Sequence, residues 1–421
     1  MISQLISERP GAEGIAPASL DEAVSITDFI HMSTGSSNSY LINTADGDVL
    51  INAGMGFEAG RHKRLYEPLR SGPLRYILIT QGHVDHVGGV DTFKEPGTVL
   101  VAHETNALCQ ADDERIESFR QRRSFVFFPD LISEAIRILS EDPSIVQSKP
   151  TPDLLVGDRH ELEVGGRRFE LLSVPGGETR DSLVVWMPEE SILFSGNTIG
   201  PLFPHFPNLY TIRGDKYRFM SPYLESLQRI IDLGPELLIT GHFEPIRGKE
   251  LIKAALERIK EASVWVHERT LEAMNEGKDL YEAMREIKLP AELEVGQGYG
   301  KVPWAVRAIY EGAAGWFRMR ATSELYPVAP EEAASDLVAL AGGAGPVVER
   351  AAAKFEAGDI LAALGLVEAA LAHDSSDTSA LKLSLAIHER LLVDSGGENF
   401  WEVRWLEHVI RETRALIGEE G

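Results

Sequence analysis

The pattern of apolar and polar residues changes near residue 250. Before that point, short β-rich runs alternate with Gly-rich turns, among them "SYLINT", "DVLINAG", "YILIT", "TVLVAH", "SLVVWM" and "ELLITGH". The Gly165-Gly166 pair within "HELEVGGRRFELLSV" is typical of a β-hairpin turn. Beyond residue 250, "ELIKAALERIKEASVWVHERTLEAMNEG" carries apolar residues at helical spacing, and Gly277 is its predicted stop. The pattern predicts a β-rich region followed by a helical one.

A second helical feature lies near the end of the chain. The stretch "AAAKFEAGDILAALGLVEAALAHDSSDTSALKLSLAIHERLL" predicts two helices around "HDSSD", with small residues where they would cross. It resembles a single tetratricopeptide-like hairpin. Because a solenoid needs about three such repeats, packing or dimerisation is favoured over peptide recognition.

Length, charge and cysteine content narrow the class of protein. At 421 residues and 43% hydrophobic, the chain is long enough for two or three domains. No apolar run approaches the roughly 18 residues that span a bilayer, and the start, "MISQLISERP", predicts no export signal. The single cysteine, Cys109, excludes an intrachain disulfide, so a cytoplasmic location is expected. The formal charge of -24 argues against a nucleic-acid partner.

The run "ILITQGHVDHVGG" places polar side chains at the end of a predicted buried strand. After that strand come Gln81, His83, Asp85 and His86, within a turn marked by glycines. Short polar side chains can converge at such an edge, and imidazoles with a carboxylate suit zinc or a neighbouring first-row metal. A second predicted strand, in "ELLITGHFEP", delivers His242 in the same way. Alone, His242 would as readily be structural, but together the two strand ends predict one metal site.

Several motifs then occur in the order seen in a known superfamily. The segments "GSSNSYLINTADGDVLINAG", "SVPGGE", "LFSGN" and "TGH", with the loop at 81–86, resemble the metallo-β-lactamase superfamily. More narrowly, "FPNLYTIRG" and the run 277–317 resemble its alkyl sulfatase branch. The resemblance implies an α+β chain, with an αββα sandwich over 1–250 and an all-α dimerisation domain over 251–421. It also implies a homodimer that hydrolyses sulfuric esters by a metal-bound hydroxide, with two zinc ions.

The resemblance assigns ligands to both ions. One zinc would be held at the positions of Gln81, His83 and Glu178, the other by Asp85, His86 and His242, with the bridging carboxylate at the position of Asn197. Gln81 and Asn197 depart from the family pattern, because each offers a weakly donating amide. Asp85 and Glu178 would balance one divalent ion, which predicts one tight zinc at Asp85, His86 and His242. The alternative is that water fills the gaps and both ions bind.

The same resemblance suggests groups that contact an anionic small-molecule substrate. Arg213 is the expected anion clamp, because a guanidinium offers two parallel donors to an oxyanion. Further substrate contacts and catalytic groups are expected at these positions: Asn208, Tyr210, Tyr299, Asp85 and, as proton donor to the departing oxygen, His205. Two functions stay open: a hydrolase of a sulfate or related anionic ester, and a diverged lyase, isomerase or ligand-binding protein with a depleted metal site.

Overall fold

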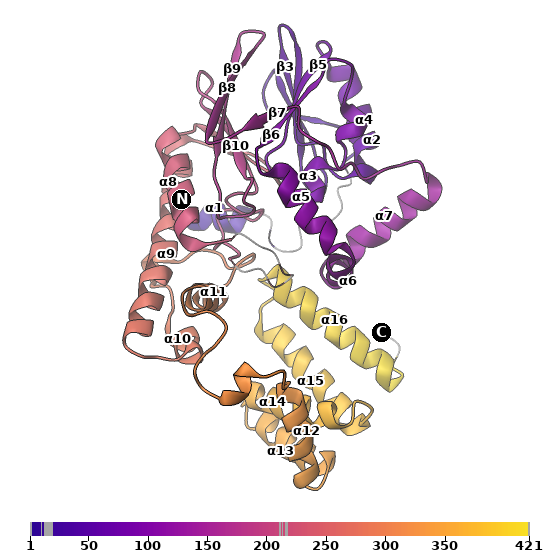
Figure 1. Cartoon of the computed structure of the whole chain (residues 1–421), viewed down its shortest axis with the longest axis vertical. Helices are drawn as coiled ribbons and strands as arrows, with labels where there is room; N and C mark the ends of the chain where they lie inside the picture. Colours follow the sequence, from indigo (N-terminus) through magenta and orange to yellow (C-terminus); the bar gives the residue numbers. More distant parts are fainter. Residues whose placement is uncertain are drawn as a thin grey trace. The chain divides into compact units, whose positions relative to one another are not determined.

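Two β-sheets packed face to face form the core of the first of two units in this computed structural model. The structure describes residues 2–9, 11, 20–209, 212, 214 and 218–419. The first sheet has the order β1-β2-β3-β4-β5-β6-β7 and the second β13-β12-β11-β10-β9-β8 (Figure 1). The strands of the first sheet are β1 (Val24–Ser25), β2 (Ile30–Ser33), β3 (Ser39–Thr44), β4 (Gly47–Ile51), β5 (Leu74–Leu78), β6 (Val99–His103) and β7 (Leu154–Val156). Those of the second are β8 (Arg159–Val164), β9 (Arg167–Ser173), β10 (Leu183–Met187), β11 (Ile192–Gly196), β12 (Leu237–Thr240) and β13 (Ile246–Arg247).

Alternating side chains divide the apolar residues of these strands between two faces. Ile42 and Leu78 of the first sheet share the inner cluster with Phe169 and Val185 of the second. The intervening residues of the first sheet, such as Leu41 and Ile77, join a separate cluster with the helices on its outer face. Each buried face therefore faces another layer.

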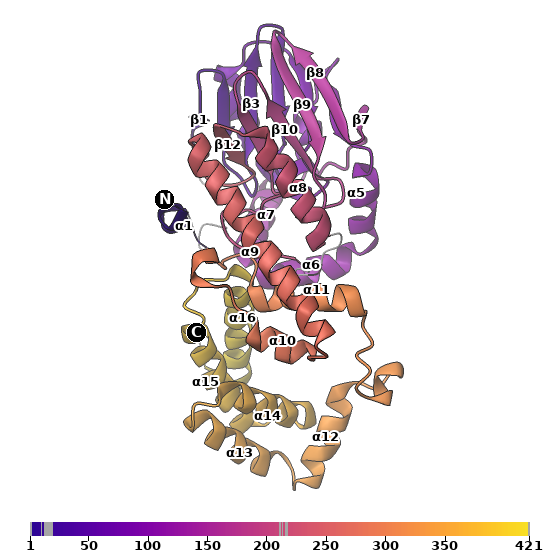
Figure 2. The ribbon, with the colours of Figure 1, turned by 90° about the vertical axis from the view of Figure 1, so that its left-hand side faces the viewer.

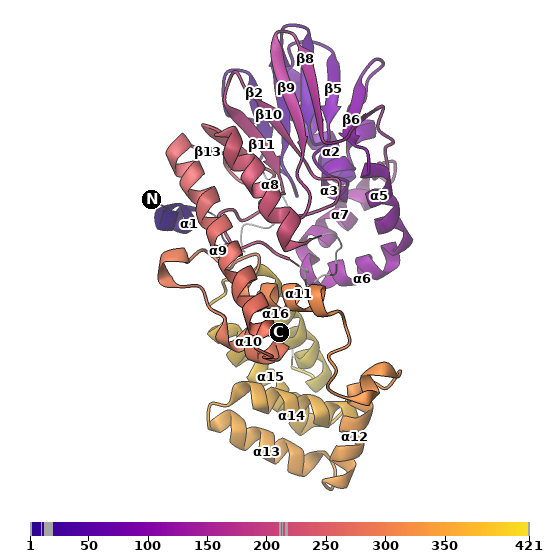
Figure 3. The same cartoon turned by 60° about the vertical axis from the view of Figure 1, so that its left-hand side comes forward.

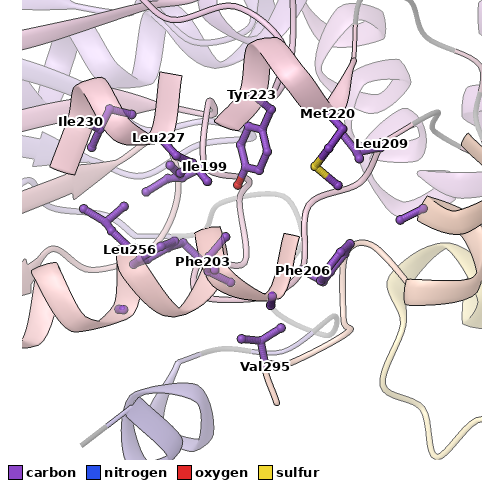
Figure 4. Packing of buried hydrophobic residues seen from close by; sticks show 14 of the residues in the cluster. Ile199, Phe203, Phe206, Leu209, Met220, Tyr223, Leu227, Ile230, Leu256 and Val295 are labelled. Carbon is purple, nitrogen blue, oxygen red and sulfur yellow. The ribbon is translucent and has the colours of Figure 1, made fainter. Parts of the chain in front are cut away.

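Helices cover the outer face of each sheet (Figures 1 and 2). On the first sheet lie α2 (Gly56–Tyr66) and α4 (Val90–Phe93), and on the second α8 (Met220–Leu233) and α9 (Lys249–Asn275). Figure 4 shows Tyr223, Leu227 and Ile230 of α8 with Leu256 of α9, all members of the hydrophobic cluster on the outer face of the second sheet. The expected αββα sandwich is confirmed.

Among the residues that the structure describes, the first unit contains nine further helical elements outside these four layers. Three helices, α5 (Asn106–Arg115), α6 (Glu117–Phe127) and α7 (Pro129–Glu141), form an excursion between β6 and β7. On α6, Arg123 Nη2 donates a hydrogen bond to the Ile212 carbonyl. The others are α1 (Ile2–Glu8), η2 (Glu67–Leu69), α3 (Val84–Val87), α10 (Leu280–Glu286), η3 (Ala291–Leu293) and α11 (Val302–Ala314).

The chain divides into the compact units Met1–Tyr310 and Glu311–Gly421. The boundary expected at residue 250 therefore falls inside the first unit. The reason is packing: α9 lies on α8, β12 and β13, so most of the helical run that follows residue 250 belongs with the sandwich. No helix in the described ranges is both long and apolar enough to cross a membrane.

The second unit is all-helical. It contains η4 (Thr322–Leu325), α12 (Pro330–Leu340), α13 (Ala344–Glu356), α14 (Ile360–His373), α15 (Thr378–Asp394) and α16 (Phe400–Ile417). Within it, α14 packs against α12, α13 and α15, and α15 packs against α16 (Figure 3). The expected helical hairpin is present as α14 and α15, which flank residues 374–377.

Candidate metal centre

Six of the seven candidate ligands follow the carboxyl ends of three strands, and Glu178 lies in the loop between β9 and β10. Gln81, His83, Asp85 and His86 follow β5, Asn197 follows β11, and His242 follows β12. The end of β5 is fixed by Asn52, which has a left-handed φ of 58° and whose Oδ1 accepts a hydrogen bond from Thr80 N at 3.0 Å. Because β11 and β12 are parallel, their ends meet at one sheet edge.

A glycine permits the close approach of the loops after β11 and β12. Gly241 N donates to the Gly196 carbonyl at 2.9 Å. A Cβ atom at position 241 would lie 2.0 Å from Asn197 Oδ1, well inside contact distance. Only glycine therefore leaves the Asn197 amide where it lies.

The first expected ligand group is brought together, but as a hydrogen-bonded set. Gln81 Nε2 lies 2.8 Å from His83 Nδ1. Since an amide nitrogen only donates, His83 Nδ1 is the acceptor. Gln81 Oε1 is buried and has no hydrogen-bond partner among the described residues. Glu178 Oε2 lies 3.8 Å from the same His83 nitrogen.

Glu178 has a buried cationic partner that sequence reasoning missed. Arg218 Nη1 and Nη2 donate to Oε1 and Oε2 of Glu178 at 2.9 and 2.8 Å. The side chains of Arg218 and Glu178 are 1% and 2% exposed. Such a bidentate guanidinium–carboxylate pair is strong and directional. It places a fixed positive charge where the resemblance implies a dication, so Gln81, His83 and Glu178 do not fit a metal ion as they stand.

The second expected ligand group keeps donors of the right type. Asp85 Oδ2 lies 3.5 Å from His86 Nε2. Burial lowers the pKa of His86, and desolvation of the ring lowers the pKa of His242 to about 4, so both imidazoles are neutral near pH 7. Two neutral imidazoles and a carboxylate suit a single divalent ion.

These side chains are not arranged around an ion in the described structure. Asn197 Nδ2 donates to His86 Nε2 at 3.1 Å, which occupies the lone pair that would bind a metal. Within the described ranges, no group of three or more His, Cys, Asp or Glu side chains is placed to hold a metal ion. Binding therefore requires the Asn197 amide to leave His86.

Asp181 is a further acidic residue of the site that sequence reasoning missed. It is fully buried, and its Oδ2 accepts from Asn106 Nδ2 at 2.7 Å. A Cβ atom at Gly82 would lie 3.1 Å from the same oxygen, so the carboxylate lies beside the loop that follows β5. Its charge partly opposes the lowering of the His86 pKa. Its position three residues after Glu178, in "GGETRDS", was an available signal.

Two of the expected substrate and catalytic residues have defined hydrogen-bonding geometry. His205 Nδ1 accepts from Gly298 N at 2.9 Å, so the neutral ring carries its proton on Nε2. The Asn208 carbonyl accepts from Arg218 Nη1 at 3.3 Å, which links this loop to Glu178. Asn208 Nδ2 is buried and has no hydrogen-bond partner in the part of the chain that the structure describes.

Tyr299 lies near the turn after β11, because a Cβ atom at Gly200 would be 3.6 Å from its ring. Tyr210 and Arg213 lie outside the described residues.

Family models match both parts of the chain. The metallo-beta-lactamase superfamily model matches residues 32–242, half of the chain, and the alkyl sulfatase dimerisation model matches residues 280–399. The latter match begins in the first compact unit and ends in the second. Both matches agree with the resemblance seen in the sequence.

Several relatives of this chain are named alkylsulfatases. A linear primary-alkylsulfatase of Pseudomonas sp. is 26% identical over 403 residues, which cover 90% of this chain and 74% of that protein. An alkyl/aryl-sulfatase of Saccharomyces cerevisiae is 23% identical over 76% of this chain, and the match spans 52% of its own length.

A solved structure shares the fold. The stereoselective inverting sec-alkylsulfatase of Pseudomonas sp. superposes with a TM-score of 0.80 at 19% identity, covering 99% of this chain and 70% of that one. The matched motifs, the sandwich and the helical region agree, so the chain belongs to the metallo-β-lactamase superfamily.

Proposed function

We propose that this protein is a metal-dependent hydrolase of a sulfate ester with an apolar organic group. One observation carries the proposal: the Asp85 carboxylate lies 3.5 Å from His86 Nε2 and within electrostatic range of His242, and both imidazoles are neutral, in a chain whose relatives include alkylsulfatases. Membership of the superfamily implies metal binding. We assign one zinc ion to Asp85, His86 and His242.

The bound ion would act as a Lewis acid and lower the pKa of water. The remaining chemistry belongs to side chains. Asn208 Nδ2 is a buried donor that a sulfate oxygen can satisfy, which would offset the cost of its desolvation. His205 holds its proton on Nε2 and is assigned to donate it in a hydrogen bond to the departing oxygen, which stabilises the negative charge that develops there. The guanidinium of Arg213, with Tyr210, is assigned to the sulfate group, and Tyr299 to the mouth of the site.

The protein is further proposed to act as a homodimer. The dimerisation family model supports this assignment, as does the apolar surface of α12, where Leu337 and Leu340 are 66% and 84% exposed. Two large apolar side chains at (i, i+3) lie on the same helix face and favour a covered surface.

Release of inorganic sulfate tests the proposed activity. Purified protein of measured zinc content is incubated with primary and secondary alkyl sulfates of increasing chain length, and sulfate is quantified. We expect release from at least one alkyl sulfate, and loss of that release in Asp85→Asn, which keeps the shape of the side chain and removes its charge. A zinc-loaded protein that releases no sulfate from the whole panel would rule out the proposal.

A second function is favoured by one observation. At both positions that depart from the family pattern, an amide nitrogen donates a hydrogen bond to a histidine: Gln81 to His83, and Asn197 to His86. That arrangement suits a non-hydrolytic member, such as a lyase, an isomerase or a protein that binds an anionic ligand. Saturable binding of an alkyl sulfate without sulfate release would support it.

A further inference from the structure

The buried ion pair between Arg218 and Glu178 lies at the first metal position. Both carboxylate oxygens of Glu178 accept from the guanidinium, at 2.9 and 2.8 Å. His83 Nδ1 lies 3.8 Å from Glu178 Oε2 and already accepts from Gln81 Nε2. We propose that the Arg218 guanidinium takes the place of the first metal ion, as a permanent cation that limits this centre to one metal.

Charge and burial support this assignment. Zinc binds its ligands at about 2 Å, so an ion shared by His83 and Glu178 would lie next to the guanidinium. Like charges repel strongly at such short range when solvent is excluded. Removal of Arg218 from Glu178 would leave a buried, unpaired charge, which is strongly unfavourable. The guanidinium therefore competes with a metal ion for Glu178. As part of the chain, it cannot diffuse away from the site.

The other residues of this position agree with a neutral, metal-free arrangement. Gln81 is uncharged and uses its amide nitrogen to hold His83. The charge of Glu178 is balanced by Arg218, which leaves Asp85 as the carboxylate for the ion at the second position. Arg218 also donates to the Asn208 carbonyl, so the same cation positions the loop assigned to the substrate.

This inference rests on the proposed function in one respect, the zinc ion assigned there to Asp85, His86 and His242. Its opposite is an ordinary supporting role, in which Arg218 orients Glu178 toward a metal. The two roles predict opposite effects of Arg218 removal on the zinc content of the protein. If Arg218 replaces the metal, its removal opens the position to an ion. If it orients a ligand, its removal weakens metal binding.

Zinc stoichiometry, measured by elemental analysis after equilibration with zinc and removal of excess, separates these roles. The proteins compared are the wild type, Gln81→His, Arg218→Gln and the double variant Gln81→His/Arg218→Gln. We expect about one zinc per chain in the wild type and in Gln81→His, a zinc content above one in Arg218→Gln, and a further rise toward two in the double variant, in which an imidazole and the Glu178 carboxylate become available together. Two zinc ions in the wild type or in Gln81→His alone would overturn the proposal, as would a lower zinc content in Arg218→Gln than in the wild type.

A second variant shows whether a change in zinc content results from misfolding. Glu178→Leu/Arg218→Met removes the ion pair as a whole and keeps the volume apolar, which buried sites often tolerate. We expect this protein to keep about one zinc per chain, and loss of that zinc would contradict the proposal. A wild type with one zinc but no sulfate release would remove the proposed function and leave this inference standing.

Discussion

Asn197 Nδ2 lies 3.1 Å from His86 Nε2 and donates to it. The amide therefore fixes the tautomer of His86, with the ring proton on Nδ1. That Nδ1 atom is buried and has no hydrogen-bond partner among the described residues. The contact holds the imidazole in a neutral form suited to a metal, yet it occupies the nitrogen that the metal needs.

Asn197→Asp exchanges this competitor for a ligand of the same shape. We expect the zinc dissociation constant to fall by about 10- to 100-fold, the size of effect typical for groups around a metal site. The constant is measured by competition with a chromogenic chelator. Asn197→Ser, which removes the amide without adding charge, is the control and should improve affinity less. Equal affinities in the wild type and Asn197→Asp would show that the amide does not compete.

Arg218→Met should destabilise the protein by about 3 to 5 kcal/mol, because Glu178 would keep a buried charge without its partner. Glu178→Leu/Arg218→Met should recover most of that loss. Urea unfolding of zinc-free protein measures both effects. If the double variant is as unstable as the single one, packing of the arginine stem, and not charge, dominates.

Gly241→Ala should displace Asn197, because the new Cβ atom would lie 2.0 Å from Asn197 Oδ1. We expect a loss of about 1 to 3 kcal/mol of stability, as for other overpacked sites. Gly312→Ala in α11 is the matched control and should be neutral or stabilising, because among the described residues no atom outside the adjacent backbone of the helix lies within 4 Å of the added carbon. Similar effects of the two substitutions would refute the steric argument.

His62 should make the fold sensitive to acid. Burial lowers its pKa from 6.5 to about 3, and its Nδ1 lies 2.7 Å from Ser33 Oγ. Because the folded pKa is the lower one, the unfolded chain binds a proton first as pH falls. Stability should therefore decline below pH 6.5, by at most about 1.4 kcal/mol per pH unit from this residue, until about pH 3.

Unfolding by urea between pH 7 and pH 4 checks this expectation. His62→Asn should flatten the decline, because the amide that replaces the imidazole takes up no proton in either state. The same slope in the wild type and His62→Asn would assign the acid sensitivity to other groups.

The apolar face of α12 should matter for assembly. Leu337→Glu/Leu340→Glu should shift a dimer toward monomer in sedimentation velocity at micromolar concentration, because charge on a buried apolar contact is strongly unfavourable. Glu331→Lys in the first turn of α12 changes charge without removing an apolar group and serves as the control. A wild type that sediments only as monomer would end the homodimer assignment.

The strand ends of the site were predictable because their signals are local. Apolar runs closed by glycine and polar residues mark β5, β11 and β12. The residues after β11 and β12 lie at one edge of the second sheet, where Asn197 contacts His86 of the loop after β5. The same reasoning located Asp85, His86 and His242 in one neighbourhood.

Long-range partners were not predictable in this way. Arg218 lies 40 residues from Glu178 along the chain, and its segment, "DKYRFM", carries no periodicity or motif. Local patterns report which face a residue occupies, not which distant residue it meets. The division into compact units was not predictable for a related reason: helical spacing marks α9 as a helix, but only packing assigns it to the sandwich.

The bridge between His205 and Gly296 ties the chain back onto itself. Phe206 N also donates to the Gly296 carbonyl at 2.7 Å, so the segment that follows His242 leaves the second sheet after β13 and returns to the candidate site through α9 and α10. The two histidines thus sit near the anchor points of one closed chain loop, whose interior is helical. Local opening of that loop would loosen both anchors in a single cooperative event. The proposed metal ligand and the proposed proton donor would therefore become ordered, and disordered, together.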